Sequence, residues 1–314
     1  MIHYYVSEEN TLQEIETPRA GCWISLIKPS EQEIAQVKNA YPIEENFLRA
    51  ALDLDERSRI DSDEGCTMIL VNIPFLNDSD DTELYDTIPF SIIMMDNAVI
   101  TVCSQDTAVI DSFLHGRVRG FRTQMKSRFI LQLLYQVDTL YLQYLRNIDR
   151  RSDEVEDKLQ KSTHNSELIE LLRLEKSLVY FTTALRSNEV VLERLIRMQL
   201  ITQYPDDAEL LDDVVVENKQ AIEMTNIYSG ILSGMMDAFA SVISNNLNIV
   251  MKVLAIVTII MSVPTIIFSA YGMNVNMGSL PFGQDPNGFI IILGITVVLS
   301  ILATLFFTKT NLFK

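Results

Sequence analysis

Two apolar stretches close to the C-terminal end constrain the fold of this 314-residue chain most. Residues 249–270 contain one charged side chain, that of Lys252, whose ammonium group can reach the edge of a membrane. Residues 289–307 contain none and are dense in Ile, Leu and Val. Each stretch is long enough to cross a bilayer, so the sequence predicts two transmembrane helices joined by a loop over 271–288. A buried hairpin of a globular protein is the less favoured interpretation.

Basic residues lie at the outer flanks of these helices. The loop over 271–288 contains no Lys or Arg, whereas Lys252, Lys309 and Lys314 lie at the other ends. Because Lys and Arg concentrate on the cytoplasmic side, we expect the loop outside and both termini, including the tail over 308–314, in the cytosol. The protein is therefore expected to be a multi-pass protein of the cell membrane. The N-terminus, MIHYYVSEEN, does not resemble a signal peptide.

The part before the membrane helices is strongly acidic. Residues 1–248 hold 22 of the 25 Lys and Arg and 41 of the 42 Asp and Glu, an excess of 19 negative charges. Such a surface repels nucleic acid and attracts cations. The three cysteines and three histidines are scattered, without the spacing of a disulfide framework or a zinc site. We therefore expect divalent cations and the lipid bilayer as partners, and no nucleic acid.

The first 120 residues predict a cytosolic α/β domain. Ser30 followed by Glu33 has the spacing of a capping box at the start of a helix. The segments SIIMM and AVITVC flank Asp96 and Asn97, which favour a tight hairpin. Two strands and one further helix are expected at 21–27, 66–75 and 43–57.

Residues 121–248 predict long cytosolic helices. Apolar residues recur three and four positions apart, interrupted by Asp138 and Ser152, and a return helix is expected from about 166 to 200. The third helix starts at Asp206 and meets no breaker before Pro264, so it is predicted to enter the membrane unbroken, over a length on the order of 90 Å.

The predicted fold class is therefore an α+β membrane protein. It has an N-terminal cytosolic α/β domain, long coiled-coil-like helices and two C-terminal transmembrane helices.

A polar stripe follows the third helix into the membrane. All hydroxyl groups between Val253 and Ala270 fall on one face, at alternating steps of three and four residues. A coiled-coil seam normally carries large apolar residues, so a seam of small and polar ones favours contact with water or another helix. The stripe comprises Gly230, Gly234, Asp237, Ser241, Ser244, Asn248, Met251, Ala255, Thr258, Ser262, Thr265 and Ser269.

Tight helix packing is the alternative interpretation of the stripe, because small residues let membrane helices approach. The second stretch shows that pattern, with hydroxyl residues at every fourth position from Thr296 to Thr308. Asp237 and Asn248 favour a pore for the first stripe, since polar groups near a bilayer usually face a wet cavity. Two helices cannot enclose a channel, so several copies would have to surround it.

The tetrapeptide Tyr271-Gly272-Met273-Asn274 directly follows the first of the two stretches. In this place it resembles the signature of the CorA magnesium transporter family, and the architecture of the whole chain is similar to that family's. The resemblance implies a homopentamer whose first span lines the pore. It implies a selectivity filter of Gly272, Met273 and Asn274 at the outer mouth, with Tyr271 in support, where oxygen atoms meet a hydrated Mg²⁺.

The resemblance also implies roles for residues further along the pore and in the cytosol. Asn248 and Met251 match the family's polar ring and hydrophobic constriction, and Leu254 lies next to them. Family members bind regulatory Mg²⁺ between subunits, and Asp213 matches one ligand by distance from the signature, with Asp53 and Asp55 as candidate partners. The pore-lining residues are then Asp237, Asn248, Met251, Leu254, Ala255, Thr258, Ser262 and Thr265.

The sequence thus predicts a channel for Mg²⁺, with Co²⁺ and Ni²⁺ as further candidates, driven by the membrane potential and gated by Mg²⁺. A zinc transporter of the same superfamily is the nearest alternative, although such proteins typically have Ile at the position of Met273. A membrane-tethered coiled-coil scaffold is a second alternative. An enzyme is not expected, because no phosphate-binding Gly loop, nucleophile elbow or histidine cluster is found. The external loop departs from the family pattern, since Asp285 is its only acidic residue.

Overall fold

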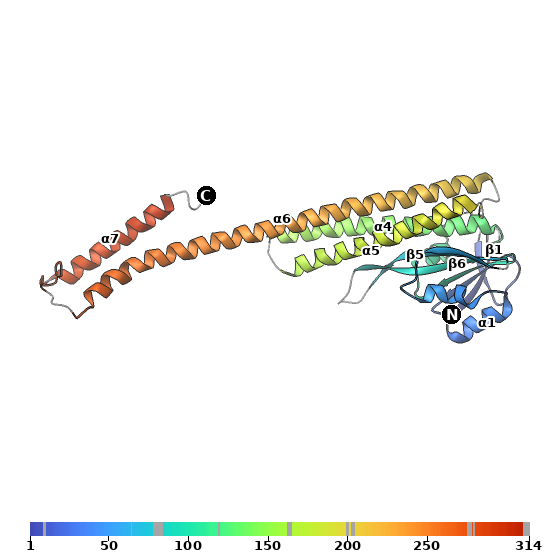
Figure 1. Ribbon diagram of the computed structural model, residues 1–314, viewed down its shortest axis with the longest axis horizontal. Coiled ribbons are helices and arrows are strands. Elements are labelled where there is room, and N and C mark those ends of the chain that lie inside the picture. Colours follow the sequence, from blue (N-terminus) through green and yellow to red (C-terminus); the bar gives the residue numbers. More distant parts are fainter. Residues whose placement is uncertain are drawn as a thin grey trace. The chain divides into compact units, whose positions relative to one another are not determined.

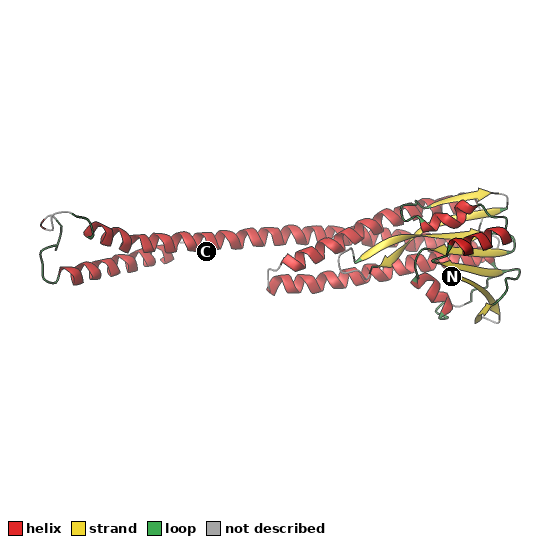
Figure 2. Ribbon diagram, turned by 90° about the horizontal axis from the view of Figure 1, so that it is seen from below, coloured by secondary structure: helices red, strands yellow, loops and turns green. Residues whose placement is uncertain are grey.

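The computed structural model of the chain describes residues 1–8, 11–63, 65–77, 84–118, 120–161, 165–198, 201, 205–274, 278 and 280–309. The chain divides into two compact units, an N-terminal unit of residues 1–236 and a C-terminal unit of residues 237–314. Strands are confined to the N-terminal unit, and the described residues of the C-terminal unit form helices and turns (Figure 2).

A seven-stranded mixed sheet forms the centre of the N-terminal unit, in the order β2-β1-β3-β7-β6-β5-β4. The central strands β3 and β7 are parallel, and every other neighbouring pair is antiparallel. The strand bounds are β1 Ile2–Glu8, β2 Thr11–Ile15, β3 Cys22–Ile27, β4 Arg59–Asp63, β5 Cys66–Leu76, β6 Tyr85–Met94 and β7 Ala98–Cys103. The two predicted strands are confirmed as β3 and β5, and the hairpin through Asp96 and Asn97 is confirmed between β6 and β7.

Short helices cover one face of the sheet (Figure 1). They are α1 (Glu31–Ala40), α2 (Glu45–Arg49) and the 3₁₀ turn η1 (Ala50–Leu52). Ile34 and Leu48 pack there in a core with Ile24, Met68 and Ile100 of the sheet.

The predicted capping box is confirmed. The Glu33 amide donates to Ser30 Oγ, and the Ser30 amide donates back to the Glu33 carboxylate.

The helix predicted over 43–57 is wrong in its extent. Helix α2 ends at Arg49, and after η1 the backbone of Asp53 is extended. The Asp55 amide donates to Asp53 Oδ1 at 3.1 Å, a local turn that competes with helix formation. The chain then enters β4 at Arg59.

Long helices cover the opposite face (Figure 1). They are α4 (Lys126–Lys161) and α5 (Asn165–Met198), preceded by the short α3 (Ala108–Leu114). The first part of α6 (Pro205–Tyr271) lies on the side of α4 and α5 that faces away from the sheet (Figure 1). An aromatic cluster joins α3 and α4 to the sheet, because the ring centroid of Trp23 in β3 lies 6.0 Å from that of Phe113 and 5.2 Å from that of Phe129. The predicted long helix, return helix and unbroken third helix are confirmed, and α6 continues through Pro264.

The C-terminal unit consists of the end of α6 and of α7 (Gly288–Lys309). Both helices are long and apolar enough to cross a membrane. A core helix of a soluble protein is mostly buried, whereas 0% of the most apolar 18-residue stretch of α6 and 6% of that of α7 is buried among the described residues. This exposure argues against the buried hairpin.

Candidate functional site: a polar helix face and the loop that follows it

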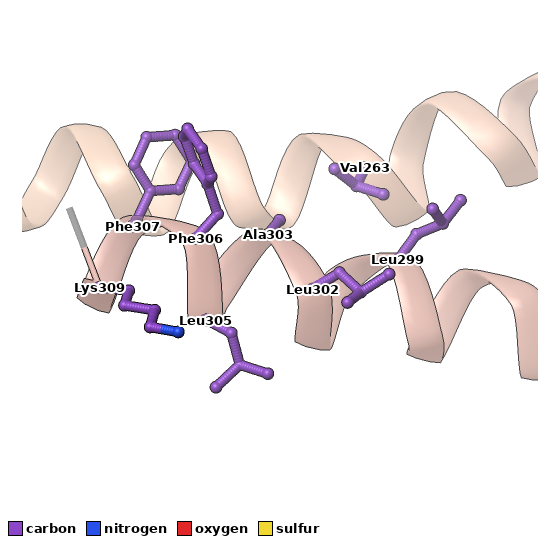
Figure 3. A pocket seen from close by; sticks show the side chains of 8 residues that line it. All are labelled: Val263, Leu299, Leu302, Ala303, Leu305, Phe306, Phe307 and Lys309. Atoms are coloured by element: carbon purple, nitrogen blue, oxygen red, sulfur yellow. The ribbon is translucent and has the colours of Figure 1, made fainter.

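The helix α7 covers only one side of α6 within the C-terminal unit. Val263 of α6 lines an apolar groove of about 990 Å³ with residues of α7 (Figure 3). Pro264 and Phe268 line a second groove, of about 300 Å³, with Thr296, Ser300 and Thr304 of α7. The groove-lining residues of α7 in Figure 3 are Leu299, Leu302, Ala303, Leu305, Phe306, Phe307 and Lys309. The hydroxyl groups of Thr296, Ser300 and Thr304 therefore belong to the face of α7 that packs toward α6.

The polar stripe of α6 lies on the other side of the helix. An α-helix turns by roughly 100° per residue, so Thr265, Thr258 and Ser262 point roughly 100°, 120° and 160° away from Pro264. Most stripe residues, Thr258 and Thr265 among them, are exposed, and Ser262 is half-buried. Packing between the two helices of one chain therefore does not account for this stripe.

Three stripe hydroxyls within the membrane stretch donate their protons to their own helix. The oxygens of Thr258, Ser262 and Thr265 lie 2.8, 2.7 and 2.9 Å from the backbone carbonyls of Leu254, Ile259 and Met261. A hydroxyl oxygen that has donated its only proton still offers lone pairs as an acceptor. The stripe thus presents acceptors, which suit a cation or the protons of its hydration shell.

The remaining predicted pore residues lie along the same helix. Asp237, Asn248, Met251, Leu254 and Ala255 are all exposed on α6, and the described part of the chain covers none of them. Met251 and Leu254 place large apolar side chains between the acceptors of Asn248 and Thr258 along the chain.

Helix α6 ends at the predicted signature. Its last residue is Tyr271, and the amide of Gly272 donates to the carbonyl of Phe268 at 2.9 Å. A Cβ atom at Gly272 would lie 3.3 Å from that carbonyl oxygen, so a larger residue would crowd the helix end. The Tyr271 hydroxyl donates to the carbonyl of Pro281 at 2.7 Å and ties the helix end to the loop.

Beyond this tie, the side chains of Met273 and Asn274 are exposed at the tip of the C-terminal unit. Part of the predicted external loop, residues 275–277 and 279, lies outside the described residues.

The candidate regulatory ligands do not form a complete metal site within one chain. Asp213 is exposed on α6. Burial raises the pKa of Tyr135 in α4, and the nearby carboxylates of Glu217 and then Asp213 raise it further. Asp53 and Asp55 are exposed and joined to each other in the turn after η1. No hydrogen bond or ion pair of the described residues links them to Asp213, and no cluster of three or more His, Cys, Asp or Glu is found there.

The cysteines show no sign of reactivity. Cys22, Cys66 and Cys103 are free and buried. Burial raises the pKa of both Cys66 and Cys103 to about 11, so their thiols stay protonated at neutral pH.

One polar residue of the long helices has an environment that sequence reasoning did not foresee. Asp138 of α4 is buried and accepts a hydrogen bond from Asn218 of α6. Its only signal in the sequence is that it interrupts an apolar repeat.

Comparisons with known proteins match this chain over most of its length. The family model described as CorA-like Mg²⁺ transporter protein matches residues 19–309. The cobalt/magnesium transport protein CorA of Methanocaldococcus jannaschii is 29% identical over 92% of this chain and 90% of its own length. The cobalt/magnesium transport protein CorA of Thermotoga maritima is 27% identical over 91% of this chain and 82% of its own.

One solved structure has a similar fold over nearly the whole chain. The complete structure of the CorA magnesium transporter from Methanocaldococcus jannaschii superimposes with a TM-score of 0.82 at 25% identity, covering 99% of this chain and 98% of that one.

Proposed function

The chain belongs to the CorA-like Mg²⁺ transporter family, and from this premise we propose that it is one subunit of a homopentameric channel that admits Mg²⁺ to the cell. The observation that carries the proposal is the acceptor-lined face of α6, which points away from α7 and ends at the signature Gly272-Met273-Asn274. Copies arranged around this face would enclose a polar path. Co²⁺ is a further candidate cargo, in keeping with the two cobalt/magnesium relatives, and Ni²⁺ is another candidate.

The filter at the outer mouth works on a hydrated ion. Mg²⁺ gives up its water reluctantly, so a ring of amide oxygens from Asn274 would bind the hydration shell. The exposed position of Asn274 and Met273 directly after the helix end supports this role. The tie from Tyr271 to Pro281 holds that end in place.

The path then narrows toward the cytosol. Hydroxyl oxygens of Thr265, Ser262 and Thr258 follow the filter, and the apolar side chains of Leu254 and Met251 form a constriction. Such a constriction can close a pore by excluding water. Asn248 provides the next polar ring, and Asp237 attracts the ion where it leaves.

The membrane potential drives uptake in this proposal. With the loop over 271–288 outside and both termini in the cytosol of a cell-membrane protein, Mg²⁺ entering at an inside-negative potential gains about 4.6 kcal/mol per 100 mV, twice the value for a single charge. We assign residues 1–120 and 121–248 to the cytosolic part, 249–270 and 289–307 to the membrane, and 308–314 to the tail.

Mg²⁺ is also the regulator. Acidic surfaces of neighbouring subunits repel one another unless divalent ions bridge them. Asp213 is the leading ligand, with Asp53 or Asp55 of another subunit as its partner. That the described residues of one chain form no cluster of three ligands is compatible with a site shared between subunits.

Cysteine accessibility tests the pore face with a matched pair. In full-length protein, Ser262→Cys places a thiol on the stripe, and Val263→Cys places one in the groove beside α7. The native thiols are buried and give a low background. A water-soluble thiol reagent should modify Ser262→Cys much faster and block flux, and Mg²⁺ should slow the reaction. Equal rates at both positions would contradict a water-filled path along the stripe.

The zinc alternative is tested by comparing the uptake rates of Zn²⁺ and Mg²⁺. If Zn²⁺ enters reconstituted vesicles faster than Mg²⁺ at equal concentration, the chain is a zinc transporter of the same fold. A scaffold would pass neither ion.

A further inference from the structure

A buried carboxyl group lies between the helices α4 and α6 of the N-terminal unit. Asp138 of α4 is 2% exposed, and Asn218 of α6 is 1% exposed. The amide nitrogen Nδ2 of Asn218 donates to Asp138 Oδ1 at 3.0 Å. The other end of this amide, Oδ1 of Asn218, is buried and has no hydrogen-bond donor among the described residues. The pair therefore lacks one proton donor.

The surroundings leave room for one water molecule at most. The cavity beside Asp138 has a volume of about 10 Å³, at the lower limit for a single water molecule. Its other lining residues are apolar apart from one amide, namely Val71, Leu134, Val137, Asn188 and Leu192. Both polar atoms of Asn188 are already engaged with Asn72 and Ser58. An anion at Asp138 would lose its water shell without replacement.

The charged groups near Asp138 do not compensate an anion either. Glu217 of α6 is the titratable neighbour on the facing helix, and its negative charge disfavours a second one. Tyr141, on α4 itself, stays protonated because burial and the nearby carboxyl raise its pKa. The residues that face Asp138 from α5 and β5 are Asn188, Leu192 and Val71, and none of them titrates. Asp138 makes no ion pair in the described part of the chain.

We propose that Asp138 is a proton-binding site, in which the neutral carboxylic acid and the amide of Asn218 donate a hydrogen bond to each other. The proton on Asp138 supplies the donor that Oδ1 of Asn218 lacks. Burial raises the pKa of Asp138 to about 8, and the hydrogen bond from Asn218 opposes part of that rise.

The hydrogen bonds of this site join α4 to α6, the helix that continues into the first membrane stretch. Below the pKa of Asp138, both the nitrogen and the oxygen of the Asn218 amide have hydrogen-bond partners. Above this pKa, the unhydrated carboxylate of Asp138 faces the amide oxygen of Asn218, which is also an acceptor. The contact between the two helices therefore weakens as the cytosol becomes alkaline, which gives the long helix a sensitivity to protons that is separate from any Mg²⁺ site.

Infrared spectroscopy of the full-length protein in detergent tests the site independently of transport. The carbonyl stretch of a protonated carboxyl is resolved from that of carboxylates, and exposed carboxyls are ionised at neutral pH. We expect wild type to show this band at pH 7 and to lose it with a midpoint near pH 8. Asp138→Asn, which mimics the neutral acid, should lack the band, and the exposed-site control Asp213→Asn should keep it.

A second variant keeps the test decisive if Asp138→Asn fails to fold. Asn218→Leu removes both the donor to the anion and the acceptor for the proton of the acid. A hydrogen bond to a charged group is the stronger of the two, so the midpoint should move upward. No band in wild type at pH 7 would overturn the proposal. A band that survives in Asp138→Asn, or a midpoint that Asn218→Leu leaves unchanged, would equally overturn it by assigning the proton to another residue.

Discussion

The side-chain amide of Asn188 in α5 makes hydrogen bonds to the edge of β5 that the backbone of a neighbouring strand would otherwise make. Leu70 is the last residue of β5 that pairs with β4, and Asn72 lies two residues beyond it. There the amide of Asn188 accepts from the Asn72 backbone N–H at 2.9 Å and donates to the Asn72 carbonyl at 2.8 Å. It also accepts from the Ser58 hydroxyl at 2.9 Å. Replacing Asn188 by Ala removes all three hydrogen bonds.

The size of the effect follows from which groups keep a partner. The Asn72 carbonyl still accepts from the Tyr141 hydroxyl at 3.0 Å, and Ser58 still accepts from the Asn72 side chain at 3.0 Å. The Asn72 backbone N–H loses its partner, which costs about 1–3 kcal/mol. The space left by the amide adds about 1 kcal/mol. We expect Asn188→Ala to lower the free energy of unfolding by about 2–4 kcal/mol.

The only tryptophan provides the assay. Trp23 is fully buried in the same unit, so its fluorescence reports chemical unfolding of the full-length protein in detergent. Arg186→Ala, an exposed position on the same helix, should leave the midpoint within the scatter of wild type. If Asn188→Ala and Arg186→Ala unfold at the same denaturant concentration, the hydrogen-bond reasoning is refuted.

Two further predictions concern protons and Mg²⁺. The pKa of Asp138 is about 8 in the fold against an unperturbed 3.8, so between these pH values the folded state binds the extra proton. The contribution of Asp138 to the free energy of unfolding must fall as pH rises, by up to about 1.4 kcal/mol per pH unit. Unfolding of Asp138→Asn, followed by Trp23 fluorescence, should lack this pH dependence. Equal slopes in wild type and variant would contradict the prediction. Asp213→Lys places a fixed cation at the proposed regulatory site, so Mg²⁺ should add less protection against protease than in wild type. Equally steep Mg²⁺ dependence would exclude Asp213 as a sensor.

The long helices and the membrane stretches could be predicted from the sequence because their signals are local. Absence of charge over about twenty residues marks the membrane stretches, and the three-and-four spacing marks the long helices. The outer strands β1, β2 and β4 were missed. The sequence of β4, RIDSD, is almost entirely polar and forms a strand because β5 lies beside it.

The pairings within the sites could not be read from the sequence in the same way. Asn218 lies 80 residues from Asp138, and only the packing of α6 against α4 brings them together. The polar stripe was visible as a spacing, but its position opposite α7 depends on which face of α6 Pro264 and Phe268 turn to the second helix. A partner for Asp213 could not be placed because its proposed site is shared between subunits.

Mg²⁺ influx into vesicles that contain the purified protein tests the central claim most directly, with a dye inside and a set potential. Asn274 is exposed beyond the helix end and supports no core, so Asn274→Ala should fold and assemble as wild type does. We predict that wild type admits Mg²⁺ at a rate that increases with inside-negative potential, and that Asn274→Ala loses selective uptake while its oligomer persists. Absence of Mg²⁺ uptake by wild type at an inside-negative potential, or a wild-type rate in Asn274→Ala, would contradict the account.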